Sequence, residues 1–593
     1  MSKRIIGRML RGGWRRRGIV ALATGGLLAA AGWGALRGAP FPAARLAQYP
    51  AAVVLTDRRG EPLRVRLGVN DLDCRPSYVP APGHWIVRAL IAAEDQRFWS
   101  HPGLDGLALL RAVRQNVSAG RRISGASTLS TQVIRLVQPR RRTLAAKVIE
   151  AFRALQMEQR YSKLDILAQY LNRAPFGGNI VGIEAAAWRY FGKQAADLSL
   201  AEAALLAGLP QAPSRLRPDR HPAAARARQA YVLERMQAGG EISAGEARLA
   251  LAQPLAIRQA HYPFRAPHFT DWAGVPPGLP PGAPAVTTLD SDWQRLAEEV
   301  LERRLAGRAI TGGAIVLLDV RTGAVRALAG SPDYAAPDGG QYNAALAARG
   351  AGSTLKPFVY ALALDQGRLS PHSMLRDVPR HYRDYDPTNF DPVFRGVVSV
   401  REALVLSLNL PAIEAQDRVG QPRFLQLLRR LGLTTLSRPA DHYGTGLVLG
   451  NGEVRLLDLV NAYACLARGG AYLPVRAFEA LPPPAPRRLF SPEACWLITE
   501  MLSGDERAQD ATGHAADVRL PRLAWKTGTS AGRRDAWTVA YNPEVVIGVW
   551  VGNLDGARSD WLVGRQAATP MVWDIFRRLY PDNQGPWFAR PPG

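Results

Sequence analysis

The stretch that decides the fold runs from Gly350 to Phe358 and reads Gly-Ala-Gly-Ser-Thr-Leu-Lys-Pro-Phe. Proline is tolerated in the first turn of a helix, so Pro357 predicts a helix that begins close to Ser353. Residues three apart share a helix face, which places the Lys356 amine beside the Ser353 hydroxyl. A serine next to an amine at a helix start can act as an acyl-transfer nucleophile. Ser-x-x-Lys alone is common and usually marks only a solvated helix start, so the rest of the chain must decide.

Length and charge limit the number of domains and the kind of partner that the chain can have. A chain of 593 residues is too long for one core and indicates several domains. The net charge of +25 indicates an acidic partner. Nothing resembles a zinc finger or an RNA-binding sheet, so we expect lipid and phosphate rather than nucleic acid. Only six of the 75 basic residues are lysine, and lysine, unlike arginine, can lose its proton when desolvated. Lys356 fits such a role.

The three cysteines predict no metal site. Cys74, Cys465 and Cys495 form no CxxC pair and no metal-ligand spacing. We interpret them as small core residues, while a Cys465–Cys495 bridge stays open.

An uncharged segment near the N-terminus predicts a membrane anchor. Residues Gly18 to Leu36 follow a strongly basic tail at 1–17, and their length suits a hydrocarbon core of about 30 Å. The basic flank predicts a cytoplasmic N-terminus, with everything beyond about residue 40 outside the cytoplasm. A cleaved signal peptide is the alternative, with Ala29 to Ala31 as a cleavage region. No small-x-small site ends the segment, so an uncleaved transmembrane helix is favoured.

The region 46–217 has helical periodicity and carries three polar clusters. The first, Glu94 to Gly103, places an acid, an imidazole and aromatics at a helix end. The second, Gly125 to Arg135, is small and rich in hydroxyls. The third leads from Arg140-Arg141-Arg142 into a helical pair, Lys147 and Glu150. Each cluster alone is more simply a cap, a loop or a surface ion pair.

In this order, the clusters resemble the peptidoglycan glycosyltransferases of family 51, the polymerase half of class A bifunctional penicillin-binding proteins. The resemblance covers Trp85 to Ser214 and includes Phe176-Gly177-Gly178 and Leu209 to Ser214. It implies a lysozyme-like, mostly α domain on the outer face of the cytoplasmic membrane. The implied substrate is lipid II, a disaccharide-pentapeptide carried on undecaprenyl pyrophosphate.

The family's roles map onto particular residues. Glu94 corresponds to the general base, which acts with inversion at the donor sugar, and Glu150 to the second acid. The implied substrate contacts are Asp95, Phe98, His101, Ser127, Thr128, Gln132, Arg135 and Lys147, with Arg153 and Arg160 as further cations for the pyrophosphate. Ala146 and Thr131 depart from the family pattern, and the first removes one phosphate contact.

No protein metal ligands are expected, and a divalent cation, Mg or Mn, is left open at the glycosyltransferase site. A muramidase is the nearest rival, because lysozyme-like folds also use paired carboxylates. The cationic cluster from Arg140 to Lys147 favours a pyrophosphate donor instead.

The region 218–290 is proline-rich and is interpreted as a linker that contains one Ala/Arg-rich helix. A domain at 291–580 follows, then a tail at 581–593. The runs 314–319 and 324–329 flank Arg321-Thr322-Gly323 and predict a β-hairpin. Ser407-Leu408-Asn409 follows a helical run, and Lys526-Thr527-Gly528-Thr529 begins a strand, strand, turn, strand pattern through Val551.

Ser-x-x-Lys, a Ser-x-Asn motif and Lys-Thr-Gly together are the signature of β-lactamases and penicillin-binding proteins. The region Gly312 to Asn553 therefore resembles the penicillin-binding transpeptidase domain, an α/β (α+β) fold with a central antiparallel sheet. The resemblance implies Ser353 as the acylating nucleophile, Lys356 as proton acceptor and Ser407 as proton relay. It also implies a lowered pKa for Lys356, from burial and from the nearby Lys526.

Substrate contacts are implied by the same motifs. Asn409 would hold the substrate amide, and Lys526, Thr527, Gly528 and Thr529 would bind the terminal carboxylate and the peptide backbone. The backbone amides of Ser353 and Thr529 would form the oxyanion hole.

The two halves together predict a bifunctional peptidoglycan synthase, closest to the 1C type. We expect a single-pass type II protein of the inner membrane with periplasmic catalytic domains. The expected partners are lipid II, glycan strands, β-lactams at Ser353, the membrane and proteins of the wall-synthesis machinery. The 1C type commonly has a further C-terminal domain, which we expect to be absent from a chain ending at Gly593. A β-lactam hydrolase and a non-catalytic or single-activity scaffold are the alternatives.

Overall fold

The computed structural model describes residues 34–118, 127–258, 261–382, 386–481, 484–504, 522–581 and 585–592. The chain divides into two compact units. Unit 1 contains Met1–Val54, Val65–Tyr262 and Gly278–Ala283, and unit 2 contains Leu55–Arg64, Pro263–Pro277 and Pro284–Gly593. The tail at 1–17 and almost all of the anchor expected at 18–36 lie outside the described residues. Within the described residues, no helix combines the length and the apolar character needed to cross a bilayer.

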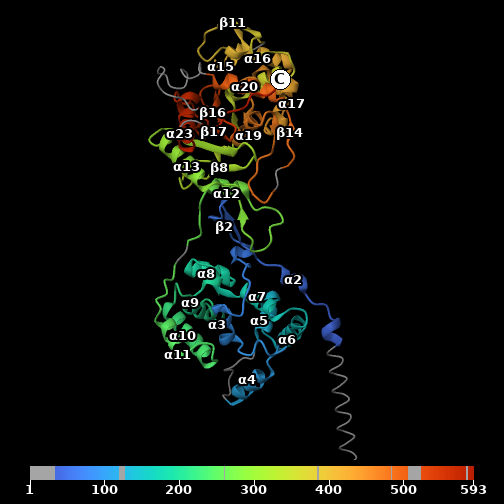
Figure 1. Cartoon of the computed structure of the whole chain (residues 1–593), viewed down its shortest axis with the longest axis vertical. Coiled ribbons are helices and arrows are strands. Elements are labelled where there is room, and N and C mark those ends of the chain that lie inside the picture. Colours follow the sequence, from blue (N-terminus) through green and yellow to red (C-terminus); the bar gives the residue numbers. More distant parts are fainter. Residues whose placement is uncertain are drawn as a thin grey trace, which may run out of the picture. The chain divides into compact units, whose positions relative to one another are not determined.

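Unit 1 is mostly α-helical, as expected (Figure 1). Its helices are α2 Ala43–Ala47, α3 Trp85–Glu94, α4 Gly106–Ser118, α5 Leu129–Val137, α6 Leu144–Glu158, α7 Lys163–Leu171, α8 Ile183–Phe191, α9 Leu200–Gly208, α10 Pro222–Ala238 and α11 Ala244–Ala252. A small sheet in the order β3-β5-β4 consists of β3 Asp73–Cys74, β5 Ile180–Val181 and β4 Pro175–Gly177.

Hydroxyl side chains begin the helices that carry the polar clusters. The Thr128 side chain caps α5 by accepting from Thr131 N, and the Thr143 side chain caps α6 by accepting from Ala146 N. Ser162 and Asp165 form a reciprocal capping box at the start of α7. These caps satisfy amide groups that have no partner inside the helix. The local sequence therefore fixes where α5, α6 and α7 begin.

The predicted linker at 218–290 differs from the structure. Residues Pro222–Ala238 and Ala244–Ala252 form α10 and α11, which pack into the core of unit 1. Val232, Leu233 and Met236 are completely buried there. Alanine and arginine dominate this stretch, so its few large apolar residues did not indicate a core helix. Burying three large apolar side chains nevertheless strongly favours packing of α10 against unit 1. Only the proline-rich segments beyond α11 are without long helices.

Unit 2 is built on a five-stranded antiparallel sheet in the order β15-β16-β17-β7-β8. These strands are β7 Gly312–Asp319, β8 Val325–Ala329, β15 Ala524–Thr529, β16 Asp535–Tyr541 and β17 Val545–Gly552. The predicted hairpin and the strand, strand, turn, strand pattern are confirmed.

The remaining strands of unit 2 form short pairs. They are β9 Arg349–Gly350 with β12 Glu453–Val454, β10 Met374–Asp377 with β11 Gly396–Ser399, and β13 Ala471–Tyr472 with β14 Arg487–Arg488. A further three-stranded sheet has the order β2-β1-β6, from β2 Pro62–Arg66, β1 Val53–Thr56 and β6 Ala285–Val286.

Helices cover both faces of the central sheet, because its strands alternate side chains between two cores. Val316 and Leu318 of β7 face the core that contains α14 and α19, whereas Ile315 and Leu317 face the core that contains α13 and α23. The helices of unit 2 are α12 Pro267–Ala273, α13 Ser291–Leu305, α14 Lys356–Asp365, α15 Val400–Val405, α16 Asn409–Val419, α17 Gln421–Arg430, α18 Ala440–Tyr443, α19 Leu456–Ala467, α20 Pro492–Ser503, α22 Gly564–Ala567 and α23 Thr569–Leu579.

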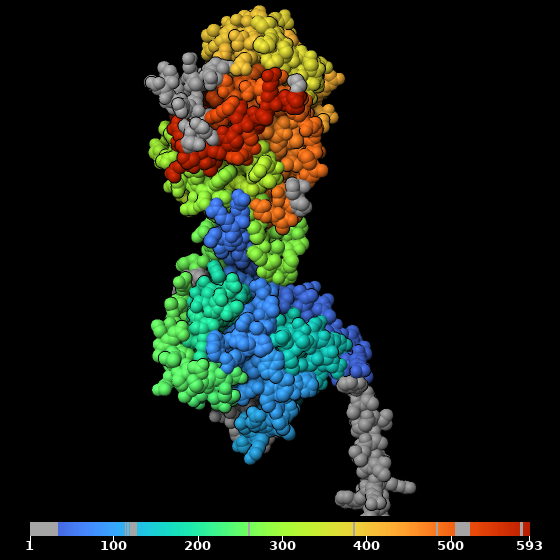
Figure 2. Space-filling model, viewed as in Figure 1, coloured from blue at the N-terminus to red at the C-terminus, as the bar shows by residue number. Residues whose placement is uncertain are grey.

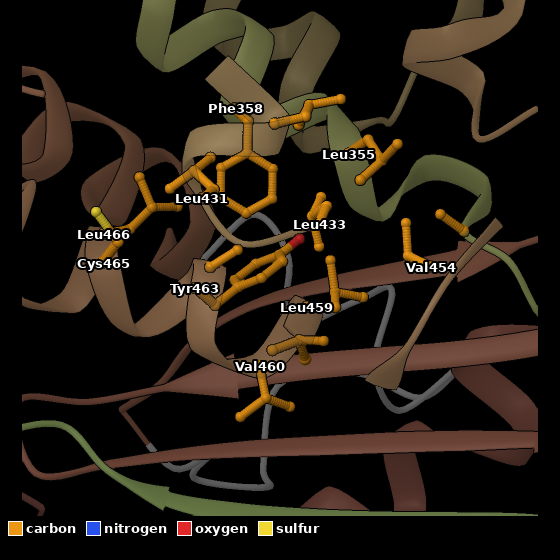
Figure 3. Packing of buried hydrophobic residues seen from close by; sticks show 14 of the residues in the cluster. Leu355, Phe358, Leu431, Leu433, Val454, Leu459, Val460, Tyr463, Cys465 and Leu466 are labelled. Carbon is orange, nitrogen blue, oxygen red and sulfur yellow. The ribbon is translucent and has the colours of Figure 1, made fainter. Parts of the chain in front are cut away.

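The helix expected at Ser353 is present. A 3₁₀ turn, Gly352–Leu355, leads directly into α14, with Pro357 in its first turn. Tyr463 of α19 supports this junction from below, because its hydroxyl donates to Thr354 O at 2.7 Å. The Tyr463 ring also meets the edge of Phe358, with ring centroids 5.1 Å apart (Figure 3). The turn that carries Ser353 is thus fixed to the core of unit 2.

Two smaller expectations have definite outcomes. Cys74, Cys465 and Cys495 are free and buried, so the Cys465–Cys495 bridge is not formed. In the region expected to be a tail, Trp587 and Phe588 pack against the core of unit 2.

We predict that Tyr463→Phe lowers the free energy of unfolding of unit 2 by about 1–3 kcal/mol, because Thr354 O would lose its donor inside the core. Tyr360→Phe is the matched control. Its hydroxyl is buried and has no hydrogen-bond partner among the described residues, so its removal should cost nothing. Urea unfolding of the two variants measures the difference. Equal destabilisation of the two variants would contradict the assigned role of the Tyr463 hydroxyl.

Candidate active sites

The first site lies in unit 1, where Glu94 ends α3. Gln132 of α5 donates from Nε2 to Glu94 Oε2 at 3.2 Å, and Arg228 Nη2 of α10 lies 3.7 Å from Glu94 Oε1. Tyr170 completes the contact set by donating to Gln132 Oε1 at 3.4 Å. Both partners of Glu94 are donors, so α5 and α10 together orient its carboxylate.

The second acid of unit 1 belongs to the same face of α5. Glu150 of α6 is buried and is held by Arg135, with Nη2 2.7 Å from Oε2 and Nε 3.2 Å from each carboxylate oxygen. Gln132 and Arg135 are three residues apart, so they project from one helix face about one turn apart. Because Gln132 holds Glu94 and Arg135 holds Glu150, α5 arranges the two predicted acids along a single face.

A buried cluster beneath this face fixes its geometry. Asp95 accepts from the Leu129 backbone amide at 2.9 Å and from His101 Nε2 at 3.1 Å. His101 Nδ1 accepts from Gly103 N at 3.0 Å, so the imidazole proton lies on Nε2 and points at Asp95. The start of α5 is therefore joined to the turn that follows Glu94.

The remaining residues predicted in unit 1 fall into two groups. Asp95, Phe98, His101 and Thr128 are buried beneath the two acids. Ser127 and Lys147 are exposed. Burial could not be assigned from sequence, because motif residues that touch a substrate and those that support them occur in the same short stretches.

Two residues of unit 1 carry contacts that the sequence did not indicate. Arg228 lies in the stretch interpreted as a linker, and no local pattern marked it. Lys163 Nζ donates to His101 O at 2.7 Å and to Glu158 Oε1 at 2.8 Å, which ties α6 and α7 to the turn after Glu94. The scarcity of lysine in this arginine-rich chain was the only available signal for Lys163.

The second site lies in unit 2 around the fully buried amine of Lys356. Its Nζ donates to Ser407 O at 2.5 Å and to Asn409 Oδ1 at 2.7 Å, and lies 3.5 Å from Ser407 Oγ. In the described part of the chain, no hydrogen bond joins this amine to Ser353 Oγ. The Ser-x-x-Lys spacing therefore brings Ser353 and Lys356 to the same turn. The Ser-x-Asn motif, through Ser407 and Asn409, holds the Lys356 amine.

Burial lowers the pKa of Lys356 to about 7, and the nearby Asp377 carboxylate opposes this shift. An amine with such a pKa is substantially neutral at physiological pH, so it can accept a proton. Burial, which was predicted, is the larger cause of this pKa, and the Asp377 carboxylate, which was not predicted, is the other.

Lys526 and Ser407 meet at the same point. Lys526 Nζ lies 2.8 Å from Ser407 Oγ and 2.9 Å from Thr527 O. Ser407 has φ of 58°, a left-handed conformation that is uncommon for a residue with a side chain. This strain costs on the order of 1 kcal/mol and aims the hydroxyl between the two lysine amines.

Two glycines allow the turn that carries Ser353 to approach strand β15. Gly352 has φ of 53°, and a Cβ there would lie 2.6 Å from Thr529 O. A Cβ on Gly528 would lie 2.7 Å from Thr354 Cγ2. Any side chain at either position would push the Ser353 turn away from the strand that carries Lys526 and Thr529.

A cavity of about 1070 Å³ opens over this site. Its lining contains all of the predicted residues of unit 2 except Lys356 and Gly528, namely Ser353, Ser407, Asn409, Lys526, Thr527 and Thr529. Five arginines also line it: Arg349, Arg395, Arg533, Arg534 and Arg565. The arrangement suits an extended ligand that carries carboxylates.

Among the described residues, no group of three His, Cys, Asp or Glu side chains could hold a metal ion.

Two protein-family models match the chain. The model described as Transglycosylase matches residues 77–237, and the model described as Penicillin binding protein transpeptidase domain matches residues 313–560. Each match contains one of the two sites.

Curated relatives agree with both matches. Penicillin-binding protein 1C of Escherichia coli (strain K12) is 41% identical over 493 residues, which cover 82% of this chain and 62% of that protein. Penicillin-binding protein 1F of Bacillus subtilis (strain 168) is 30% identical over 502 residues, which cover 79% of this chain and 69% of that protein. The chain thus spans less than two thirds of the length of the 1C protein.

A solved structure shows the same fold. The crystal structure of penicillin-binding protein 1A from Haemophilus influenzae matches with a TM-score of 0.59 and 19% identity, and the match covers 92% of this chain and 94% of that one.

We predict that the stability of unit 2 depends on pH through Lys356. The folded pKa is about 7 and the ordinary value is 10.5, so between these values the unfolded chain binds more protons. The free energy of unfolding of the wild type, minus that of Lys356→Met, should therefore rise with pH across this window by on the order of 1 kcal/mol per pH unit. Urea unfolding at several pH values measures it. A flat difference would mean that the amine keeps its ordinary pKa.

Proposed function

This chain belongs to the class A penicillin-binding proteins, which combine a transglycosylase with a penicillin-binding transpeptidase, and on that premise we propose that it is a bifunctional peptidoglycan synthase. Unit 1 polymerises lipid II into glycan strands, and unit 2 cross-links their stem peptides. The observation that carries the proposal is that one chain contains both the acids held along α5 and the Ser353–Lys356–Ser407 site.

In unit 1, Glu94 acts as the general base. It removes the proton of the acceptor sugar's 4-hydroxyl, whose oxygen attacks the donor's anomeric carbon with inversion while the bond to the pyrophosphate oxygen breaks. The contacts from Gln132 and Arg228 support this role, because they orient the Glu94 carboxylate.

The leaving pyrophosphate needs cations. Arg135 is held in place by Glu150, and its side chain remains partly exposed. Lys147 is exposed on the first turn of α6 and follows the basic run Arg140 to Arg142. Charge-assisted hydrogen bonds from these groups would stabilise the departing phosphate. Glu150 then acts by orienting Arg135 and does not itself need to transfer a proton.

In unit 2, Ser353 attacks the penultimate D-Ala carbonyl carbon of a stem peptide while its proton passes to the neutral Lys356 amine. The peptide bond breaks, terminal D-Ala leaves with a proton relayed through Ser407, and Ser353 remains as an ester. An amine of a second strand then attacks the ester, forms the cross-linking amide and returns the proton to Ser353. A β-lactam follows the first half of this sequence, because its ring amide opens onto Ser353.

We propose that unit 1 receives its substrate from a membrane surface. Leu107, Leu109 and Leu110 of α4 are well exposed, and α4 lies at the surface of unit 1 (Figure 2). Leu144 and Val148 of α6 are also exposed, next to the basic run Arg140 to Arg142. Exposed leucines beside arginines favour an anionic bilayer. We therefore propose that α4 and the start of α6 contact the membrane that carries lipid II, with both catalytic units in the periplasm.

Two variants test the function. Ser353→Ala should abolish covalent labelling by a fluorescent penicillin and leave glycan polymerisation intact, because the two sites lie in separate units. Glu94→Gln should lower polymerisation of lipid II by about 10²–10⁴-fold and leave labelling intact, because the base is lost. Gel detection of label and of glycan chains measures both.

Matched controls make the same side-chain changes outside the two sites. Ser370→Ala changes an exposed serine of unit 2, and Glu241→Gln changes an exposed glutamate of unit 1. Both should behave as the wild type. Labelling that survives Ser353→Ala would exclude Ser353 as the nucleophile, and polymer made at the normal rate by Glu94→Gln would exclude Glu94 as the base.

The membrane contact has its own prediction. Leu107→Glu combined with Leu110→Glu should lower polymerisation several-fold in reconstituted anionic vesicles and change it less than twofold in detergent micelles, because charge opposes insertion into a bilayer. Leu249→Glu, at an exposed leucine of α11, is the control and should change neither rate. An equal loss in vesicles and micelles would count against the contact.

A further inference from the structure

A buried carboxylate lies behind the transpeptidase site of unit 2. Asp377 ends β10, and its side chain is completely shielded from solvent. Asn389 Nδ2 donates to its two oxygens at 2.8 and 3.0 Å, and the Arg395 backbone amide donates to Oδ2 at 2.9 Å. A buried carboxylate needs such donors, because an unpaired one would be very costly. None of the sequence motifs indicated this residue.

Asn389 connects that carboxylate to the Ser-x-Asn motif. Its Nδ2 also donates to Val393 O at 2.8 Å, so both amide hydrogens have acceptors. Its Oδ1 accepts from Asn409 N at 2.8 Å. This set of partners fixes the orientation of the amide, since the reverse orientation would place NH₂ against the backbone N–H.

Asn409 carries the connection to the amine. Its Oδ1 accepts from Lys356 Nζ at 2.7 Å, while its Nδ2 donates to Thr388 O at 2.6 Å. An unbroken hydrogen-bonded chain therefore runs from Asp377 through Asn389 and Asn409 to Lys356. Each member is held from two sides, which is the condition for a rigid polar network inside a core.

We propose that Asp377 and Asn389 are positioning residues for acylation at Ser353, holding Asn409 against the Lys356 amine and placing a negative charge behind it. The inference rests on the proposed transpeptidase function. Neither residue needs to touch the substrate through its buried atoms, and both act through Lys356 and Asn409.

The charges around Lys356 define what Asp377 does. Burial lowers the pKa of the amine and Asp377 raises it, which leaves it at about 7. Lys526 of β15 faces the amine across Ser407 Oγ. Glu414 of α16 accepts from the backbone of Arg376, next to Asp377 in β10. Removing the Asp377 charge should therefore lower the pKa of Lys356 further, whereas removing the Glu414 charge should leave it unchanged.

The same carboxylate anchors one wall of the cavity. Asn389 and Arg395, which Asp377 holds, both line the cavity, and so do Phe390 and Asp391 between them. Asp377 thus supports both this wall of the cavity and the Lys356 amine. A substitution at Asp377 should therefore affect both proton transfer to Lys356 and binding of the peptide in the cavity.

The test measures the second-order rate constant for acylation by a fluorescent penicillin from about pH 5 to about pH 9 on the full chain. The wild-type acylation rate should rise with pH, with a midpoint at a pH of about 7. For Asp377→Asn, the midpoint should move to lower pH by about half a unit to one unit, with a lower limiting rate. For Asn389→Ala, the limiting rate should fall about tenfold while the midpoint stays in place, because Asn409 loses its support and the charge remains. Glu414→Gln is the matched control and should keep the wild-type profile.

The outcomes separate this inference from the proposed function. A wild type that is not acylated would overturn the function itself. An acylated wild type with an unmoved or raised midpoint in Asp377→Asn would overturn the inference, even if the limiting rate fell, because a structural defect alone gives that result. An equal shift in Glu414→Gln would also overturn it. If Asp377→Asn does not fold, a limiting rate for Asn389→Ala within twofold of the wild type would decide against the inference.

Discussion

The burial of one lysine amine is the constraint on which unit 2 depends. Taking Lys356 out of water disfavours its charged form, and this shift makes the amine a usable proton acceptor. The surrounding structure has to make the burial tolerable. Ser407 O and Asn409 Oδ1 satisfy the amine, and Asp377 returns part of the lost electrostatic stabilisation. The elements that supply these groups come from β10, α16 and the turn before α16, so the site exists only when the whole unit has folded.

Unit 1 meets a similar requirement with a helix face. Gln132 and Arg135 project from adjacent turns of α5, and each holds one acid. The position of α5 is in turn fixed by Asp95 at its first residue and by Thr128 at its cap. Short motifs in this unit thus contain both the residues that hold the two acids and the residues that hold α5 in place. Both groups are needed for the same geometry.

The sequence predicted the helix at Lys356, the central hairpin and strands, and the helical character of unit 1, because each depends on local periodicity or on proline, glycine and hydroxyl signals. It did not predict α10 and α11 as core elements, since alanine and arginine conceal their apolar stripe. Nor could it reveal Arg228, Asp377 or Asn389. Their importance comes from contacts between segments far apart in the chain, which no spacing rule within one segment encodes. The partners of Lys356 were predicted as motifs, but the opposing charge that tunes it was not.

The buried cysteines have a consequence for redox chemistry. Burial raises the pKa of Cys74 and Cys465 to about 12, and raises that of Cys495 as well. At neutral pH only about one in 10⁵ of the first two would be ionised, and the thiolate is the form that attacks disulfides. An oxidising compartment would therefore have little chance of cross-linking them while the fold is intact. Their reaction with a thiol reagent would instead report the moment at which either unit opens.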